Sequence, residues 1–189
     1  MNGEVKILGF AGSLRKASLN KRILQAARNL VPKGAVLETF DLEGIPLFNQ
    51  DLEPSVPATV LGFKAKIRAS DAILIVTGEY NYGIPGVLKN AIDRGSRPPG
   101  ESAWNGKPVA ILGASPGRLG TARAQYQLRQ LFDCLNMSPV NSPEVLISRS
   151  AECFDESGDL KDGATRSLIR ELLNVLVRWT RQLQKANAS

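Results

Sequence analysis

Short apolar runs, each followed by a polar loop and then by an amphipathic stretch, recur along the chain. The clearest run, Ala72 to Thr77, is rich in β-branched residues, which is typical of a strand that a parallel sheet buries on both faces. From Ile84 the apolar spacing becomes that of one helix face, and Pro85 falls in the first turn, where its missing N–H is no loss. The pattern therefore predicts a strand, a polar loop over residues 78–83 and a helix, in that order.

The same succession occurs twice more. Val5 to Ala11 leads into a hydroxyl-rich loop over 12–20, and Val109 to Gly113 leads into a loop of small residues over 113–121. By its apolar spacing, a helix follows each of these loops. The remaining predicted elements are an edge strand over 36–42, a helix that begins near Pro57, a loop over 94–107, an edge strand over 139–147 that Pro143 interrupts, and a long C-terminal helix with Leu168, Leu172, Val175, Leu176, Trp179 and Leu183 on one face.

Five strands that alternate with helices predict a doubly wound α/β fold. We expect a five-stranded parallel sheet in the order 2-1-3-4-5 between two helical layers, in a single domain over residues 1–189. The three polar loops then gather at the carboxyl edge of the sheet, where open α/β sheets bind ligands. An irregular apolar loop over 44–51 can wall such a site or contact another subunit, and the sequence leaves both readings open.

The loop over 12–20 has the groups of a monophosphate site. Ser13 and Ser18 offer hydroxyl donors, Asn20 offers an amide donor, and Arg15 offers a guanidinium that can bind two phosphate oxygens. The helix that follows adds unpaired N–H groups and the positive end of its dipole. The spacing matches neither the GxxxxGK[ST] loop nor the dinucleotide GxGxxG fingerprint. The alternative is structural: Ser18 caps the helix, and Arg15 and Lys16 are surface charges.

Two tyrosines, an amide and flanking glycines make up the loop over 78–83, and they suit a flat ligand with polar edges. Any connection between a strand and a helix can carry such residues, so this loop alone does not decide the ligand. One loop for a phosphate and two loops for a planar ring system predict flavin mononucleotide (FMN), bound between the first and third strands.

The composition of the chain excludes several kinds of catalytic and metal site. The chain has no histidine, which excludes Ser-His-Asp and Cys-His catalysis and zinc sites that use imidazole, and we predict no metal site. Cys134 and Cys153 form no CxxC pair, so thiol redox chemistry is not expected. The net charge of +6 is spread along the chain, which favours a solvated surface over a nucleic-acid groove. The start has neither a membrane-spanning run nor the long apolar region of a signal peptide, so we expect a cytoplasmic protein.

Three motifs resemble those of the NADPH-dependent FMN reductase family of flavodoxin-like proteins, and most closely its bacterial chromate and quinone reductase branch: GSLRKASLN at 12–20, EYNYGIPGVLKNAID at 79–93 and GASPGRLGT at 113–121. The resemblance spans nearly the whole chain, and it implies that the FMN phosphate is held by Ser13, Arg15, Ser18 and Asn20. It implies that the isoalloxazine ring is lined, largely through backbone groups, by Glu79, Tyr80, Asn81 and Tyr82, and that its other edge is closed by Ser115 and Gly117. We expect no side chain to act as a catalytic acid or base.

The resemblance also implies the reaction. NADPH or NADH passes a hydride to N5 of bound FMN and leaves, and a quinone, an azo compound, free flavin or chromate then takes the electrons at the same place. Family members are similar in forming homodimers or homotetramers. The alternative is a flavodoxin-type electron carrier without a substrate of its own, but such carriers are typically acidic and this chain is basic.

Two positions depart from the usual pattern of the family. Gly78 stands where a proline commonly precedes the glutamate, and Arg94 stands where a tryptophan commonly follows the aspartate. Glycine in place of proline costs roughly 0.4–1 kcal/mol through the freedom of the unfolded chain, and we expect flavin binding to survive this. The candidates for a contact to the 2′-phosphate of NADPH are Arg94, Arg97 and Arg118.

Overall fold

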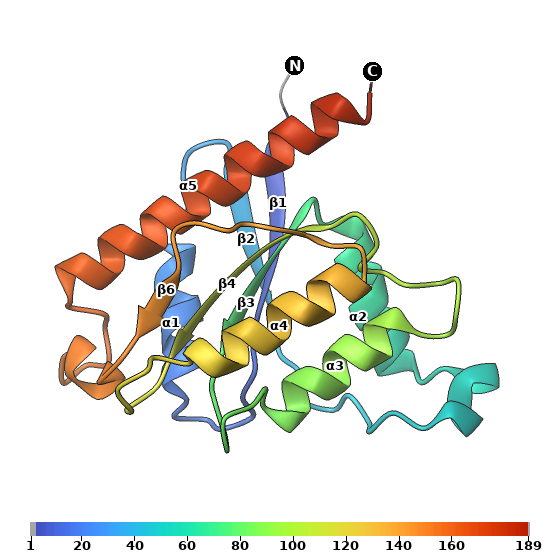
Figure 1. Ribbon diagram of the computed structural model, residues 1–189, viewed down its shortest axis with the longest axis horizontal. Helices are drawn as coiled ribbons and strands as arrows, with labels where there is room; N and C mark the ends of the chain where they lie inside the picture. The colour runs from blue at the N-terminus through green and yellow to red at the C-terminus, as the bar shows by residue number, and fades with distance from the viewer. Residues whose placement is uncertain (1–2, 189) are drawn as a thin grey trace.

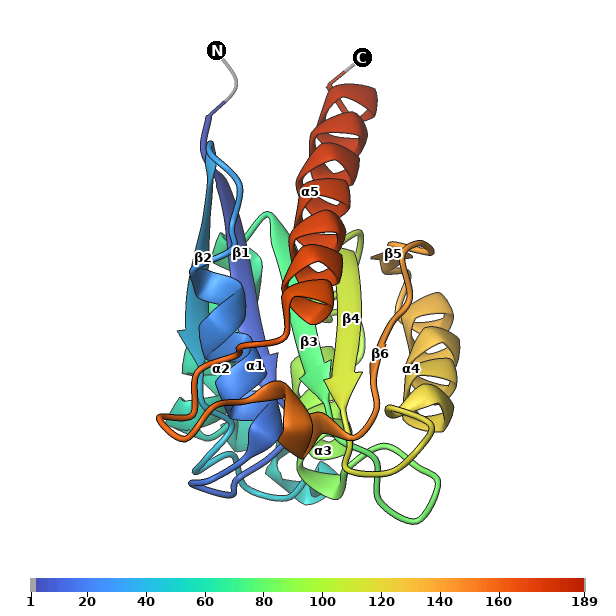
Figure 2. The same ribbon diagram turned by 90° about the vertical axis from the view of Figure 1, so that its left-hand side faces the viewer.

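The computed structural model describes residues 3–188 and places a parallel sheet between two layers of helices (Figures 1 and 2). The strands are β1 (Val5–Ala11), β2 (Ala35–Phe40), β3 (Ala72–Thr77), β4 (Pro108–Ala114), β5 (Ser138–Pro139) and β6 (Val145–Ile147). Their order is β2-β1-β3-β4-β5, and β6 also pairs with β4. The predicted α/β class and the 2-1-3-4-5 order are therefore confirmed. Residues 1, 2 and 189 of the predicted domain lie outside the described residues.

Helices cover both faces of the sheet. They are α1 (Leu19–Arg28), α2 (Ala58–Ala69), α3 (Gly86–Ser96), α4 (Ala122–Cys134) and α5 (Gly163–Ala186), with short 3₁₀ helices at Gln50–Ser55 and Ser150–Cys153. Apolar side chains of α1 and α5 pack on one face, and those of α2, α3 and α4 pack on the other. Because of this cover, β3 and β4 are buried along their whole length. Among the helices of residues 3–188, none combines the length and apolar character that a membrane span needs.

The predicted edge strand over 139–147 is wrong as a single element. β5 pairs with the start of β4 and β6 pairs with its end, so the sheet within residues 3–188 has six strands rather than five. Pro143 lies in the connection between β5 and β6, and Pro139 lies within β5. Pro143 has no N–H to offer a strand ladder, which fits the break in pairing with β4 between β5 and β6.

The predicted loop over 94–107 is wrong at its start, because α3 continues to Ser96. The rest of the stretch is irregular but carries a core residue. Trp104 is only 1% exposed and packs edge-to-face against Phe63, with 5.8 Å between the ring centroids. Its Nε1 donates to the carbonyl oxygen of Ile92 at 2.9 Å. The segment therefore returns to the core between two stretches of turn-forming residues.

Arg94 holds the loop over 44–51 against α3. Its side chain is 4% exposed, its Nε donates to the carbonyl oxygen of Pro46 at 3.1 Å, and a second guanidinium nitrogen donates to the next carbonyl along the chain. Asn90, one turn earlier, donates to the same Pro46 oxygen at 3.1 Å and accepts from the N–H of Phe48 at 2.8 Å. The arginine that replaces the family's usual tryptophan is thus a structural residue here.

The buried face of α5 differs in part from the prediction. Leu172 and Leu176 are buried as predicted, but Leu168 is 40% exposed. The face that packs on the sheet also contains Ile169, Leu173 and Val177. Both sets of residues have helical spacing, so the periodicity alone could not decide which side of the helix meets the sheet.

Candidate functional site

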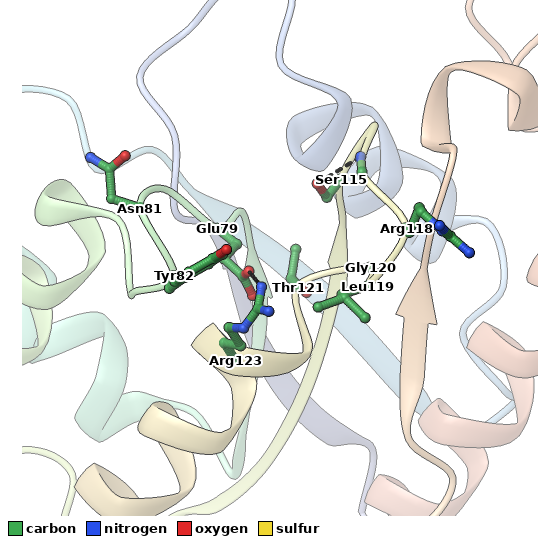
Figure 3. A pocket seen from close by; sticks show the side chains of 10 residues that line it. Glu79, Asn81, Tyr82, Ser115, Arg118, Leu119, Gly120, Thr121 and Arg123 are labelled. Carbon is green, nitrogen blue, oxygen red and sulfur yellow. Dashed lines mark hydrogen bonds and ion pairs between the residues drawn. The ribbon is translucent and has the colours of Figure 1, made fainter.

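The loops after β1, β3 and β4 enclose two adjoining cavities at the carboxyl edge of the sheet. We name these loops the first loop (12–18), the second loop (78–83) and the third loop (115–121), because α1 begins at Leu19 and β4 extends to Ala114. The smaller cavity, of about 180 Å³, is lined by the first loop and the near ends of the other two. The larger cavity, of about 590 Å³, lies between the second loop and the third (Figure 3). Glu79 and Ser115 line both cavities.

The structure brings all ten residues predicted from the sequence to these cavities. The smaller cavity is lined, among others, by Ser13, Arg15, Ser18, Asn20, Glu79, Tyr80 and Ser115. The larger cavity is lined, among others, by Glu79, Asn81, Tyr82, Ser115 and Gly117. The reason is topological: β1, β3 and β4 are neighbours in the sheet, so loops that are far apart in sequence leave it side by side.

The first loop brings hydroxyl groups and a helix N-terminus to the smaller cavity. Ser18 precedes α1, and its Oγ accepts from the N–H of Lys21 at 3.4 Å, so the helix cap of the structural alternative is present. The Oγ of Ser13 accepts from the N–H of Arg15 at 3.3 Å. Both serines are buried, and each hydroxyl can still donate its hydrogen to a ligand. The Arg15 side chain is exposed at the rim.

Asn20 connects α1 to the end of β4. Its Nδ2 donates to the carbonyl oxygen of Ala114 at 3.0 Å, and its Oδ1 accepts from the N–H of the same residue at 2.9 Å. One side-chain N–H stays available to a ligand, since an amide group carries two. Asn20 therefore fixes the spacing between the first and third loops as well as lining the cavity.

The second loop contains a tight turn. The N–H of Tyr80 donates to the carbonyl oxygen of Gly83 at 3.2 Å, and the N–H of Gly83 donates back to Tyr80 at 2.9 Å. Between them, Asn81 and Tyr82 have φ angles of 49° and 66°. Two successive residues in the left-handed region define a turn that favours glycine or asparagine, and tyrosine is strained there. Such strain is found preferentially at functional sites.

The third loop is anchored to β6 and α4. The N–H of Ser115 donates to the carbonyl oxygen of Ile147 at 3.0 Å, and its Oγ accepts from the N–H of Gly117 at 3.1 Å. Thr121, with a φ of 75°, is also in the left-handed region. Its buried Oγ1 accepts from Nε2 of Gln125 at 3.1 Å, so α4 holds the end of the loop.

Sequence reasoning missed the contribution of α4. The guanidinium of Arg123 lies 3.7 Å from the ring centroid of Tyr82, and its Nη1 lies 3.7 Å from Oε1 of Glu79 (Figure 3). The other carboxylate oxygen of Glu79 accepts from the N–H of Ala124 at 3.1 Å. The charge of Glu79 is therefore balanced, whereas Arg118 lines the same cavity without an ion pair among residues 3–188. No motif marks Arg123, and its only signal is a position just after the third loop.

The three arginines predicted as candidates for the 2′-phosphate lie in different places. Arg94 is buried beneath the loop over 44–51, and Nε of Arg97 donates to Oε1 of Glu53 at 2.6 Å. Neither of the two lines the cavities described above. Arg118 does line the larger cavity, so it alone of the three is placed to meet a ligand there.

A comparison with protein families decides the affiliation. The profile of the family described as NADPH-dependent FMN reductase matches residues 5–152. The chain belongs to the NADPH-dependent FMN reductase family. An NAD(P)H-dependent FMN reductase of Pseudomonas aeruginosa is 51% identical to this reductase over 185 residues, which cover 97% of this chain and 100% of the relative. A quinone reductase of Pseudomonas putida is 41% identical over 171 residues, which cover 90% and 91% of the two chains.

A solved structure supports the same affiliation. FerB, a flavoenzyme NAD(P)H:(acceptor) oxidoreductase from Paracoccus denitrificans, matches this reductase with a TM-score of 0.87 and 34% identity, over 94% of this chain and 98% of FerB. The predicted family and flavodoxin-like fold are confirmed, and the chain is an oxidoreductase that uses FMN and NAD(P)H. The site fits FMN, because the buried hydroxyls of Ser13 and Ser18 at the start of α1 suit one phosphate, and the larger cavity has room for a ring system.

Proposed function

We propose that this reductase binds FMN across the two cavities and transfers electrons from NAD(P)H to quinones. The observation that carries the proposal is the shared wall at Glu79 and Ser115, which makes one extended site from a small polar cavity and a larger one. The phosphate would lie in the smaller cavity, against the hydroxyls of Ser13 and Ser18 and the N-terminus of α1. The isoalloxazine would lie in the larger cavity, between the second and third loops.

In this proposal, the groups that stabilise the reduced flavin are mainly backbone N–H groups. N–H groups of the second and third loops would face the pyrimidine edge of the ring, where negative charge develops on reduction, and donors fixed in advance stabilise such charge. Bound FMN supplies the hydride-accepting chemistry, and the protein supplies binding and orientation. We assign no side chain of this site as an acid or a base.

We further propose that donor and acceptor occupy the larger cavity in turn, in a ping-pong reaction, and that chromate and azo compounds are acceptors besides quinones. The exposed side chains of Tyr82 and Leu119 offer apolar contact to a flat acceptor at this cavity, and Arg118 offers a charge to an anion. The larger cavity therefore offers an apolar surface to flat acceptors and a positive charge to anionic acceptors.

We also propose that the protein forms a homodimer or homotetramer and acts in the cytoplasm. Leu14 and Tyr80 are exposed on the first and second loops, and a second copy of the chain would cover apolar surface of this kind. The cytoplasm is the compartment in which NAD(P)H is available. Sedimentation velocity of the purified protein would measure the oligomeric state directly.

The proposed function is tested by absorbance and turnover. The purified protein, or the protein after FMN has been added and the excess removed by gel filtration, should show a bound flavin spectrum. It should then oxidise NADPH steadily with benzoquinone, and reciprocal plots at several quinone concentrations should be parallel. A protein that binds FMN but shows no turnover would be an electron carrier, and one that stays colourless would refute FMN binding in these cavities.

Arg15→Ala should weaken FMN binding by tenfold or more. The variant loses charge-assisted hydrogen bonds to the phosphate, each worth about 1.5–3 kcal/mol. Titration of apoprotein with FMN, followed by the quenching of flavin fluorescence, measures the dissociation constant. Lys16→Ala is the control, because Lys16 is an exposed neighbour that does not line the cavity. Unchanged affinity in Arg15→Ala would remove Arg15 from the phosphate site.

Arg118→Gln should lower kcat/KM for NADPH about tenfold relative to NADH, because only NADPH has a 2′-phosphate that a guanidinium can bind. Steady-state rates with both donors and one quinone measure this ratio. Arg178→Gln, on the exposed side of α5, is the control and should leave the ratio unchanged. An equal loss with both donors in Arg118→Gln would mean that Arg118 does not read the 2′-phosphate.

A further inference from the structure

The strained turn of the second loop needs support from outside itself. Asn81 and Tyr82 both line the larger cavity in the left-handed conformation, with φ angles of 49° and 66°. The Tyr82 side chain is 67% exposed, so burial in a core does not hold it in this geometry. A conformation of this kind persists only where the surrounding structure over-determines it.

Gln127 of α4 supplies that support through both ends of its amide. Its Nε2 donates to the carbonyl oxygen of Tyr82 at 3.2 Å, and its Oε1 accepts from the N–H of Ile84 at 3.2 Å. The two bonds bracket Gly83, where an added Cβ would lie 3.4 Å from Oε1 of Gln127. One side chain thus fixes the backbone on both sides of the turn's last residue.

Two further contacts join the same helix to the same loop. Arg123 stacks on the Tyr82 ring, as Figure 3 shows, and the N–H of Ala124 donates to the carboxylate of Glu79 at 3.1 Å. Gln127 differs from Arg123, which lines the larger cavity, because Gln127 lines neither cavity. Any effect that it has on a ligand must therefore pass through the backbone of the second loop.

We infer that Gln127 is a positioning residue, which keeps the Asn81–Tyr82 turn in the conformation that the ligand of the larger cavity requires. This inference rests on the proposed binding of FMN in that cavity. Without the two hydrogen bonds of the Gln127 amide, the turn spends part of its time in unstrained conformations. The observed dissociation constant then rises in proportion, because it equals the intrinsic constant divided by the fraction of competent molecules.

The test compares FMN affinity in three variants by titration of apoprotein. Gln127→Leu loses both hydrogen bonds and should raise the FMN dissociation constant about tenfold. Gln127→Glu keeps an acceptor for Ile84 but places a carboxylate against the carbonyl oxygen of Tyr82, so it should be impaired at pH 8. Gln130→Leu is the matched control, because Gln130 is an exposed glutamine of the same helix. It should bind FMN as the wild type does.

A pH dependence separates positioning from a general effect on stability. In Gln127→Glu a protonated carboxylic acid again has one donor and one acceptor, so the ratio of its dissociation constant to that of the wild type should fall towards one between pH 8 and about pH 4. A ratio near one for Gln127→Leu, or an equal rise in Gln130→Leu, would overturn the inference, as would a pH-independent ratio for Gln127→Glu. Failure of the wild type to bind FMN would instead refute the proposed function.

Discussion

Replacing Trp104 by alanine should lower the free energy of unfolding by about 3–5 kcal/mol. The indole is almost fully buried against the rings of Phe10 and Phe63, with centroid distances of 6.1 and 5.8 Å. Its removal leaves a cavity under α2 and α3, and it deprives the Ile92 carbonyl oxygen of the Nε1 donor. Equilibrium unfolding in urea, followed by far-ultraviolet circular dichroism, measures the loss.

Trp179→Ala provides the matched control for Trp104→Ala. Trp179 lies on α5, is only partly buried, and donates to the carbonyl oxygen of Ser138 at 3.2 Å. Its truncation should cost at least about 1 kcal/mol less, because less apolar surface leaves the core. Equal losses for the two tryptophans would contradict the central place of Trp104 in this core.

Gly113→Ala should damage stability and FMN binding together. A Cβ at this position would lie 2.5 Å from the carbonyl oxygen of Thr77 and 2.0 Å from Oγ1 of Thr121. Overpacking of this kind typically costs about 1–3 kcal/mol. Because Thr121 lines the larger cavity, its displacement should also raise the FMN dissociation constant severalfold. Urea unfolding and FMN titration of the same variant measure the two effects.

Gly62→Ala is the control for Gly113→Ala and should have the opposite sign. Gly62 lies inside α2, and an added Cβ there meets no atom within 4 Å. Alanine in a helix interior is favoured over glycine by about 0.8–1 kcal/mol, so this variant should be more stable than the wild type. A loss of stability in Gly62→Ala, or none in Gly113→Ala, would show that the close approach at Gly113 is not the cause.

The central strands could be predicted from the sequence because both of their faces are buried. β1 and β3 have the predicted bounds, and β4 differs by one residue at each end. A run such as Ala72 to Thr77 has no polar side that could suggest another structure. The position of the loops followed from these strands, and so did the gathering of the ten predicted residues at two cavities.

The parts that could not be predicted depend on contacts between distant segments. Trp104 lies in a stretch rich in glycine, proline and serine, and only the rings of β1 and α2 that it meets make it a core residue. The same holds for the site. Arg123 and Gln127 contact a loop that lies about 40 residues earlier in the chain; Gln127 and Ile84, for example, are 43 residues apart. No local sequence pattern predicts contacts between residues this far apart.

The interrupted edge formed by β5 and β6 limits how neighbouring molecules can associate. Pro139 and Pro143 deny an incoming strand a continuous row of donors, and Gln125 of α4 already occupies the carbonyl oxygen of Val145, at 3.1 Å. Fibril growth by strand addition therefore has no template on this side of the molecule. Crowding during synthesis or refolding should therefore not lead to strand addition at the edge formed by β5 and β6.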